Sequence, residues 1–334
     1  MEFEERRGQG YRPEEILLTY RDQESDRYDS HLPDDVLEFF EQWRRQQAQE
    51  NKHRLELWNS DEWGQQVRLE TVSREHLIHS RRQERVEILL SPHKYLYYVG
   101  IQQQLAVDRN DGLNDARRKL YLDHFWDSVR ELRYGNSLRL PAQYAIHMAV
   151  VSCDNYVLLR QRRSGMAIYP DAWEASIGEF MHGPLKEQFT HFKDGKPSQS
   201  EFCRQAVAEE IGEDALPESD TFRLYGFATE RLTLAPKMMV VHRSPLSIDD
   251  LEALASEKGE GLPNDPAQAV TRIKLSPTAI ADAVTDRTEL AEWGPTSKLA
   301  LMLALTQGAS DAERAAILKE VESEIHNRIP TVES

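Results

Sequence analysis

The chain has 334 residues, of which 40% are hydrophobic and 29% charged, and its formal net charge is −16. This composition is typical of a globular protein with enough apolar material for one large domain or two medium ones. The apolar runs are too short to span a membrane, and residues 1–30 lack the apolar segment of a secretory signal. The acidic excess opposes nucleic-acid binding, which needs clustered Lys and Arg. We therefore expect neither a membrane nor a nucleic-acid partner.

The chain contains two cysteines, Cys153 and Cys203. Two thiols cannot build a disulfide framework or a cysteine-rich zinc site. This cysteine usage predicts a protein of the reducing cytoplasm.

The first part of the chain predicts a polar extension followed by a small α+β domain. Residues 1–35 are polar with few periodic apolar positions, and we expect only short ordered pieces there. The domain is assigned to residues 36–138, with its boundary near 136–141. Its expected elements are a helix over 37–49, a strand over 67–71 and a helix over 119–132. Strands over 86–90 and 95–99 flank Ser91-Pro92-His93-Lys94 and predict a hairpin.

Residues 139–265 have a different character and predict a mixed sheet. The order is strand, strand, long polar loop, helix, strand, strand, which is typical of an α+β fold. The expected strands cover 144–152, 156–160, 222–228 and 237–242. The loop covers 182–200, and we interpret its two histidines, His182 and His191, as loop residues and not as zinc ligands. Residues 266–334 form a C-terminal helical segment, with helices expected over 277–285, 295–307 and 310–326.

The helix that precedes Gly212 carries the strongest chemical signal. Ser198 is the expected N-cap and Gly212 the expected stop. Glu209 and Glu210 end this helix, and Glu213 is expected one turn beyond Glu209. Carboxylate oxygens are the ligands that Mg²⁺ prefers. The pattern predicts a site for Mg²⁺ (or Mn²⁺) formed by Glu209, Glu210 and Glu213; the alternative is a solvated acidic helix end.

The segment 144–243 resembles the Nudix hydrolases. Their motif runs from a glycine through an isolated glutamate to Arg-Glu-apolar-x-Glu-Glu-x-Gly, and Val207, Glu209, Glu210 and Gly212 match its end. Gly178 is similar to the first glycine, and the approach Tyr-Pro-Asp-Ala-Trp over 169–173 is similar to the family's entry into the motif. The resemblance implies a mixed sheet sandwiched by helices.

The motif is degenerate in this chain. Gln205 and Ala206 occupy the positions of the motif's arginine and first glutamate, and the loop before the helix is longer than in the family. Glu187 is a candidate for the isolated glutamate. For the missing carboxylate we consider Glu213, Gln205 and Glu201. The layout also resembles the animal Nudix-type UDP-glucose pyrophosphatases, which have an N-terminal extension and a long insertion.

The resemblance implies metal-assisted attack of water on the diphosphate of a nucleoside diphosphate derivative, such as a nucleotide-sugar. Glu209 and Glu210 are the implied catalytic ligands. Glu230 follows a strand and is the implied late acidic residue, acting as base or ligand, with a surface carboxylate as the alternative. Family members are often dimers, so a homodimer is also implied.

The substrate side of the site is assigned to residues around the second strand. These candidates are Arg160, Arg162, Tyr169, Trp173 and Gly178. Arginines bind phosphate oxygens bidentately, and aromatic rings stack on bases or sugars. Solvated charges for the arginines, and packing onto the sheet for Trp173, are the alternatives.

Three functions compete at this point. The first is a Mg²⁺-dependent pyrophosphohydrolase, favoured by the Glu209–Glu210 pair and Gly178. The second is a catalytically weakened Nudix-like module that binds a nucleotide for regulation or protein interaction, favoured by the degenerate motif. The third is a scaffold that uses the C-terminal helices.

Overall fold

The structure is a computed structural model. It describes residues 10–20, 32–59, 65–76, 84–102, 104, 119–120, 122–126, 142–162, 171–183, 191–216, 221–229, 235–257, 269–285, 293–294 and 296–328. The predicted domain boundary near 136–141 lies outside these residues, so the division of the chain into domains stays a prediction.

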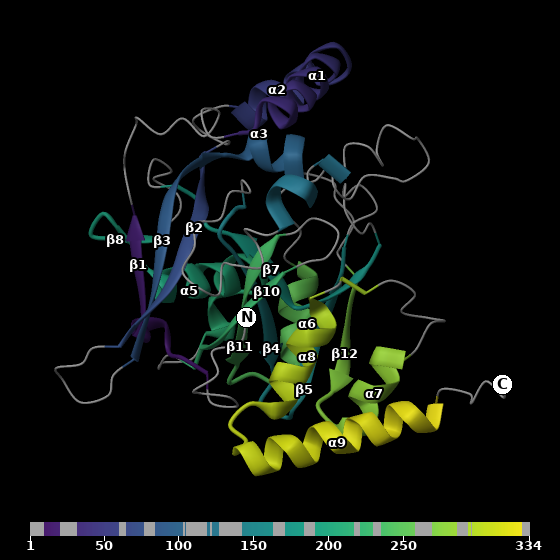
Figure 1. The fold of residues 1–334 in the computed structure, drawn as a ribbon. Coiled ribbons are helices and arrows are strands. Elements are labelled where there is room, and N and C mark those ends of the chain that lie inside the picture. Colours follow the sequence, from purple (N-terminus) through teal and green to yellow (C-terminus); the bar gives the residue numbers. More distant parts are fainter. Residues whose placement is uncertain are drawn as a thin grey trace.

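A seven-stranded mixed sheet forms the centre of the molecule (Figure 1). Its strands are β4 (Ala145–Val151), β5 (Tyr156–Gln161), β6 (Trp173–Ala175), β7 (Ile177–Phe180), β10 (Arg223–Thr229), β11 (Pro236–Arg243) and β12 (Val270–Lys274). The main order is β10-β11-β4-β5-β12. β11 runs parallel to β4, and the other neighbours along this order are antiparallel. The mixed sheet confirms the α+β class.

The sheet divides between its two central strands. β4 and β5 pair only at Val151 and Val157, after which β7 adds to β4 and β6 adds to β5. Ser176 lies between β6 and β7 in the left-handed region, at φ 56°. Its hydroxyl accepts from the Val150 N–H at 2.8 Å and donates to the Leu158 carbonyl at 2.7 Å. Ser176 therefore links the two arms where regular strand pairing stops.

Helices cover both faces of the sheet. Every residue of β4 is buried, as a strand covered on two sides requires. Ile146, Met148 and Val150 pack on the side of α5 (Gln199–Glu210), whereas Ala149 and Val151 pack on the side of α7 (Pro277–Thr285) and α8 (Ser297–Thr306). Figure 1 shows α5 and α8 on opposite sides of β4 and β11.

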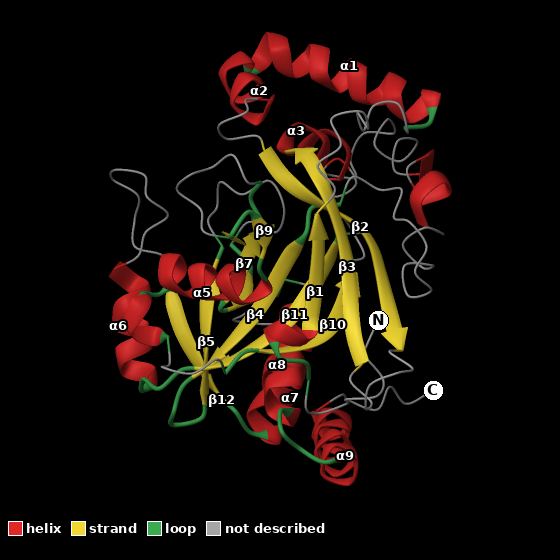
Figure 2. Cartoon of the chain, turned by 90° about the vertical axis from the view of Figure 1, so that its left-hand side faces the viewer, coloured by secondary structure: helices red, strands yellow, loops and turns green. Residues whose placement is uncertain are grey.

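The N-terminal part forms a second, three-stranded sheet with helices above it (Figure 2). The sheet has the order β1-β3-β2. Its elements and the helices nearby are the 3₁₀ turn η2 (Pro13–Glu15), β1 (Ile16–Tyr20), α1 (Asp34–Glu50), α2 (Lys52–Asn59), β2 (Gln65–His76) and β3 (Glu84–Lys94). Residues 119–120 and 122–126 are also helical. The predicted helix over 37–49 and strand over 67–71 are confirmed.

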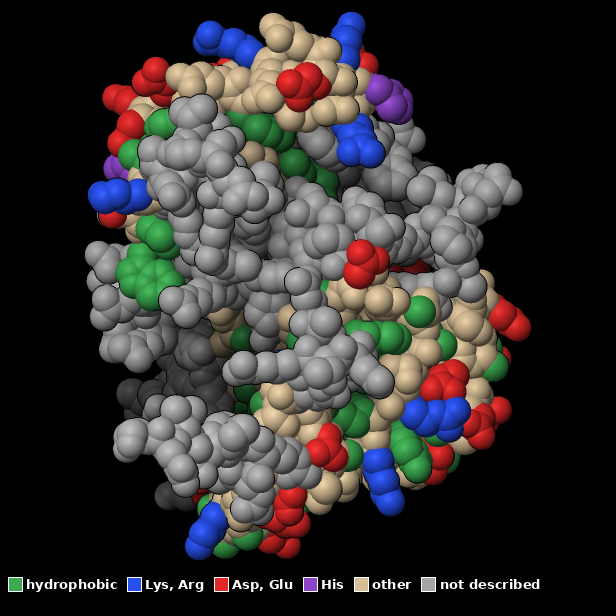
Figure 3. All heavy atoms as spheres, turned by 90° about the vertical axis from the view of Figure 1, so that its right-hand side faces the viewer, with side chains coloured by type: hydrophobic (Ala, Val, Ile, Leu, Met, Phe, Trp, Pro, Cys, Tyr) green, Lys and Arg blue, Asp and Glu red, His purple; other side chains and the backbone are tan. Residues whose placement is uncertain are grey.

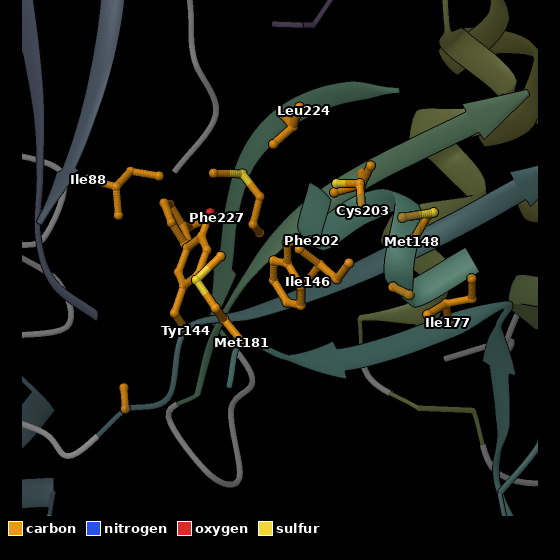
Figure 4. Packing of buried hydrophobic residues seen from close by; sticks show 14 of the residues in the cluster. Ile88, Tyr144, Ile146, Met148, Ile177, Met181, Phe202, Cys203, Leu224 and Phe227 are labelled. Atoms are coloured by element: carbon orange, nitrogen blue, oxygen red, sulfur yellow. The ribbon is translucent and has the colours of Figure 1, made fainter. Parts of the chain in front are cut away.

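The two sheets share one hydrophobic core. Ile88 of β3 and Tyr144, just before β4, belong to the same buried cluster, and Phe202 of α5 packs against Tyr144 (Figure 4). Tyr11 also pairs with Leu224 of β10 through two backbone hydrogen bonds of 2.8 Å. The N-terminal part is thus packed directly against the main sheet.

The predicted hairpin around Ser91-Pro92-His93-Lys94 is wrong. β3 runs straight through this segment and pairs with β2 from Glu84 to Lys94. Pairing between β3 and β1 ends at Leu90, so Pro92 lies where β3 has only one neighbouring strand. A proline is tolerated there because the open side of the strand needs no N–H donor. Helical turns α3 (Tyr95–Tyr97) and η4 (Tyr98–Gln102) replace the expected second strand.

Gly100 allows η4 to lie directly against α1. A Cβ at this position would lie 2.5 Å from Cε2 of Phe40 and 2.6 Å from Cζ3 of Trp43, and both rings are buried. We expect Gly100→Ala to lower the free energy of unfolding by roughly 1–3 kcal/mol, because the rings must shift in a packed core. Urea denaturation measures this. Gln49→Ala, at an exposed position of α1, is the control, and an equal effect of the two changes would contradict the packing argument.

Three C-terminal helices agree with prediction: α7, α8 and α9 (Asp311–Arg328). α6 (Ile248–Glu257) and β12 were not predicted, although α6 buries Ile248, Leu251 and Ala255 at helical spacing. Among the described helices, none is long and apolar enough to cross a membrane. On the face shown in Figure 3, acidic and basic side chains are interspersed over the described surface.

Candidate functional site

α5 begins and ends where the sequence predicts. The Ser198 hydroxyl accepts from the Glu201 N–H at 3.3 Å, which caps the first turn. Gly212 adopts φ 142°, and its N–H donates to the Val207 carbonyl at 3.0 Å. The short hairpin of β8 (Phe192–Lys193) and β9 (Lys196–Pro197) leads into this helix. The Glu209–Glu210 pair therefore occupies the last turn of a well-defined helix.

Glu210 points to β5 and forms an ion pair with Arg160. The Nη1 of Arg160 donates to Oε2 of Glu210, and the two side chains are 5% and 18% exposed. Because the arginine is almost fully buried, this charge-assisted bond is shielded from water and fixes the carboxylate. The structure therefore brings together two residues that the sequence predicted for the site.

Glu209 is exposed and is held by its own helix. The Nε2 of Gln205 donates to Oε1 of Glu209 at 2.5 Å, one turn apart on α5. Each of the two neighbouring carboxylates thus has one oxygen occupied by a protein donor. Ala206 lies between these positions on the buried side of α5, where it contributes only to the hydrophobic core.

Glu213 does not continue the helix. α5 ends at Glu210, the chain turns at Gly212, and Glu213 opens the 3₁₀ turn η7 (Glu213–Ala215) with an exposed side chain. The expected helical turn beyond Glu209 is therefore absent, because the glycine stop comes first. Within the described residues, no three His, Cys, Asp or Glu side chains gather as metal ligands, so the metal site stays a prediction.

A second ion pair lies beside the first. Arg162 follows β5, and its Nη1 donates to Oε1 of Glu174 on β6 at 2.5 Å. The two side chains are 18% and 15% exposed. Burial opposes ionisation of Glu174, but the positive charges of Arg162 and Lys237 outweigh it, and the pKa of this carboxyl is lowered. Glu174 is therefore a carboxylate at neutral pH, bonded to Arg162 and stabilised by the nearby charge of Lys237.

His147 of β4 lies next to this ion pair and is fully buried. Its Nδ1 is hydrogen-bonded to the Thr296 hydroxyl, and its Nε2 lies 3.4 Å from the Ser297 hydroxyl. Ser297 also accepts from the Ala175 N–H at 3.2 Å. Burial, with the nearby charge of Lys237, lowers the pKa of His147 to about 4. The ring is thus neutral at pH 7 and connects the start of α8 to the sheet.

Gly294 gives Glu174 its space. A Cβ at Gly294 would lie 3.3 Å from Oε1 of Glu174 and 3.1 Å from the Ser297 hydroxyl. A Cβ at Gly178 would lie 3.7 Å from Oε2 of Glu174, which is ordinary van der Waals contact, so Gly178 lies beside this carboxylate without having to be a glycine. Trp173 packs on the α8 side of the sheet, and its carbonyl accepts from the Gly294 N–H at 2.9 Å. Its ring is part of the packing, which was the alternative considered for this residue.

His191 is more than a loop residue. It is buried, and its Nδ1 accepts from the His182 N–H at 3.0 Å while the two rings stack. Its backbone carbonyl accepts from the Ser198 N–H at 2.8 Å. His191 lies outside helix and strand, as predicted, and in addition it anchors the loop to the start of α5.

The remaining candidates lie outside the described residues. They are Tyr169, Glu187 and Glu230. Three residues that the structure places around Arg162 were not predicted from the sequence: Glu174, His147 and Lys237. Glu174 does follow the Tyr-Pro-x-x-Trp approach, but its partners come from distant segments and carry no local signal.

These features define an α+β protein with two arginines at the end of one strand, each held by a carboxylate from a different element. No protein-family model and no curated protein matches the chain. A crystal structure of DR0079 from Deinococcus radiodurans is similar at 13% sequence identity and a TM-score of 0.29, over 47% of this chain and 80% of that chain. A likeness at this level carries no argument about activity.

Proposed function

We propose that residues 139–265 are a Nudix-like domain that hydrolyses a diphosphate bond in a nucleoside diphosphate derivative, such as a nucleotide-sugar, with Mg²⁺ or Mn²⁺. One observation carries the proposal. Glu209 and Glu210 end the same helix, and each is held through one oxygen by a neighbouring donor, Gln205 or Arg160. Within the described residues, neither Oε2 of Glu209 nor Oε1 of Glu210 has a hydrogen-bond partner.

The donor set fits the proposed cation. Mg²⁺ is usually bound through one or two carboxylates together with waters and substrate phosphates. Carboxylates that bind metals are themselves held by outer hydrogen bonds, as Glu209 and Glu210 are here. A bound Mg²⁺ stabilises charge on phosphoryl oxygens and lowers the pKa of water. Two oriented carboxylates are enough to supply the protein ligands for Mg²⁺, without a third carboxylate at the position of Ala206.

Arg160 and Arg162 have different proposed roles. Arg160 is bonded to Glu210, so its proposed role is to position that carboxylate. Arg162 is fixed by Glu174, with Lys237 nearby, and this arrangement favours a role in holding phosphate oxygens. A guanidinium that is already oriented loses little side-chain freedom when it binds a phosphate.

The test is turnover of a panel of nucleoside diphosphate derivatives with Mg²⁺ or Mn²⁺, with products separated by chromatography. Glu209→Gln and Glu210→Gln should each lower activity more than about 100-fold, since removing a ligand costs at least as much as removing an outer partner. Asp214→Asn removes an equal charge from the exposed turn after α5 and should leave activity unchanged. No turnover by the wild-type protein across the panel would overturn the proposed hydrolase activity.

Burial of Ala206 favours a second candidate function. The family motif has a glutamate at this position, and here the side chain lies in the core. The alternative is therefore a Nudix-like module that binds a small nucleotide ligand without converting it. Calorimetry would then give saturable nucleotide binding while chromatography finds no product; absence of binding would remove this candidate as well.

A further inference from the structure

The α8 side of the main sheet carries arginines that the proposed reaction does not use. Arg223 of β10 is paired with Val241, and Arg243 of β11 is paired with Val151. Both valines pack with α8, and paired residues of adjacent strands share a face, so both arginines belong to this side. Because β10 and β11 are antiparallel, the start of one and the end of the other meet at the same end of the sheet.

Tyr225 places a hydroxyl among these arginines. A bulge between Leu224 and Gly226 leaves Tyr225 without a paired residue, and only 3% of it is exposed. Within the described chain its hydroxyl has no hydrogen-bond partner. Burial raises the pKa of this hydroxyl, against the opposing charges of Arg223, Arg243 and Arg314 of α9. The group is therefore a protonated donor that lies near three guanidinium groups.

Arg223 and Arg243 have no acidic partner in the part of the chain that the structure describes. Arg223 donates to the Phe222 carbonyl at 2.7 Å. Arg243 donates to Oε1 of Gln307 at 3.0 Å and to Oδ1 of Asn155 at 3.2 Å. The chain carries a net charge of −16, yet these two guanidinium groups meet only neutral acceptors. Among the described residues, the charges of Arg223 and Arg243 are therefore not offset by a carboxylate partner.

Helix α8 explains only part of this arrangement. Cations near the C-terminal end of a helix are stabilising, and Arg243 contacts Gln307, the residue after α8. This accounts for Arg243. It does not account for Arg223, nor for a buried hydroxyl without a partner, which is uncommon because it is costly.

We propose that Arg223, Arg243, Arg314 and the Tyr225 hydroxyl form a binding site for a phosphate-type oxyanion. Guanidinium groups bind such anions through paired N–H donors, and the phenol supplies one further donor. The site lies on the opposite face of the sheet from the α5 carboxylates, so it is separate from the proposed reaction and independent of it.

Calorimetric titration with inorganic phosphate, at constant ionic strength and without divalent cations, tests the site. We expect saturable binding by the wild-type protein. Tyr225→Phe should weaken it about tenfold or more, the usual effect of removing a hydrogen bond to a charged group. The same variant should unfold at no lower temperature without phosphate, because it removes only a hydroxyl that has no partner.

Arg223→Gln should weaken phosphate binding at least as much. Arg272→Gln is the charge-matched control, because Arg272 is exposed on the edge strand β12 and is paired with Glu252 and Asp249. A parallel titration with methyl phosphate separates two sources: binding equal to that of phosphate indicates a phosphate monoester, and weaker binding indicates the free anion. Absence of saturable binding, or equal weakening by Arg272→Gln and Arg223→Gln, would overturn the proposal.

Discussion

Glu174→Ala should lower the free energy of unfolding by about 3 kcal/mol, near the lower end of the range for removing one partner of a buried ion pair. The change removes the carboxylate that accepts from the Nη1 of Arg162, a guanidinium whose side chain is only 18% exposed, and it leaves the charge of Lys237 nearby. The 15% exposure of the Glu174 side chain allows some solvation, which places the expected loss at this end of the range. Urea denaturation followed by circular dichroism measures it.

Two further variants define the cause of this loss. The double variant Glu174→Met with Arg162→Met should recover at least half of it, because neither charge of the pair remains in the site. Glu252→Ala breaks a partly exposed pair with Arg272 and should cost much less. If Glu174→Ala and Glu252→Ala had equal effects, Glu174 would not be the counter-charge of a largely buried site.

Acidification should destabilise the fold through His147. Its pKa is lowered to about 4 from an ordinary 6.5. Between these values the unfolded chain binds a proton that the folded chain does not, so stability is complete above pH 6.5 and falls as the pH is lowered towards 4. The difference in pKa corresponds to ~3 kcal/mol lost from this group. Denaturation at a series of pH values between 7 and 4 measures the total loss in the free energy of unfolding from all titrating groups.

Other groups also titrate in this range, so a comparison of variants isolates His147. Glutamine can bond to the hydroxyls of Thr296 and Ser297 but does not titrate. His147→Gln should therefore lose less stability than the wild-type protein between pH 7 and pH 4. His53→Gln, at an exposed position of α2, should keep the wild-type dependence. Identical curves for the wild-type protein and His147→Gln would contradict the assignment.

Local patterns predicted the elements whose cause is local. α5 begins directly after Ser198 and ends shortly before Gly212, because a cap and a glycine stop act within one helical turn. The apolar run over 144–152 predicted β4, which is buried throughout. The error at Ser91–Lys94 has the opposite origin: residues typical of turns were overridden by pairing with β2, a segment distant in sequence.

The candidate site divides in the same way. The sequence by itself determined that Glu209 and Glu210 end a helix and that Arg160 and Arg162 end a strand, because spacing and capping act over a few residues. Only the tertiary structure decided their partners. Arg160 meets Glu210 across 50 positions, and His147 meets Thr296 across 149. These long-range contacts determine which charges are paired and which carboxylate oxygens remain available. No local sequence pattern contains such contacts.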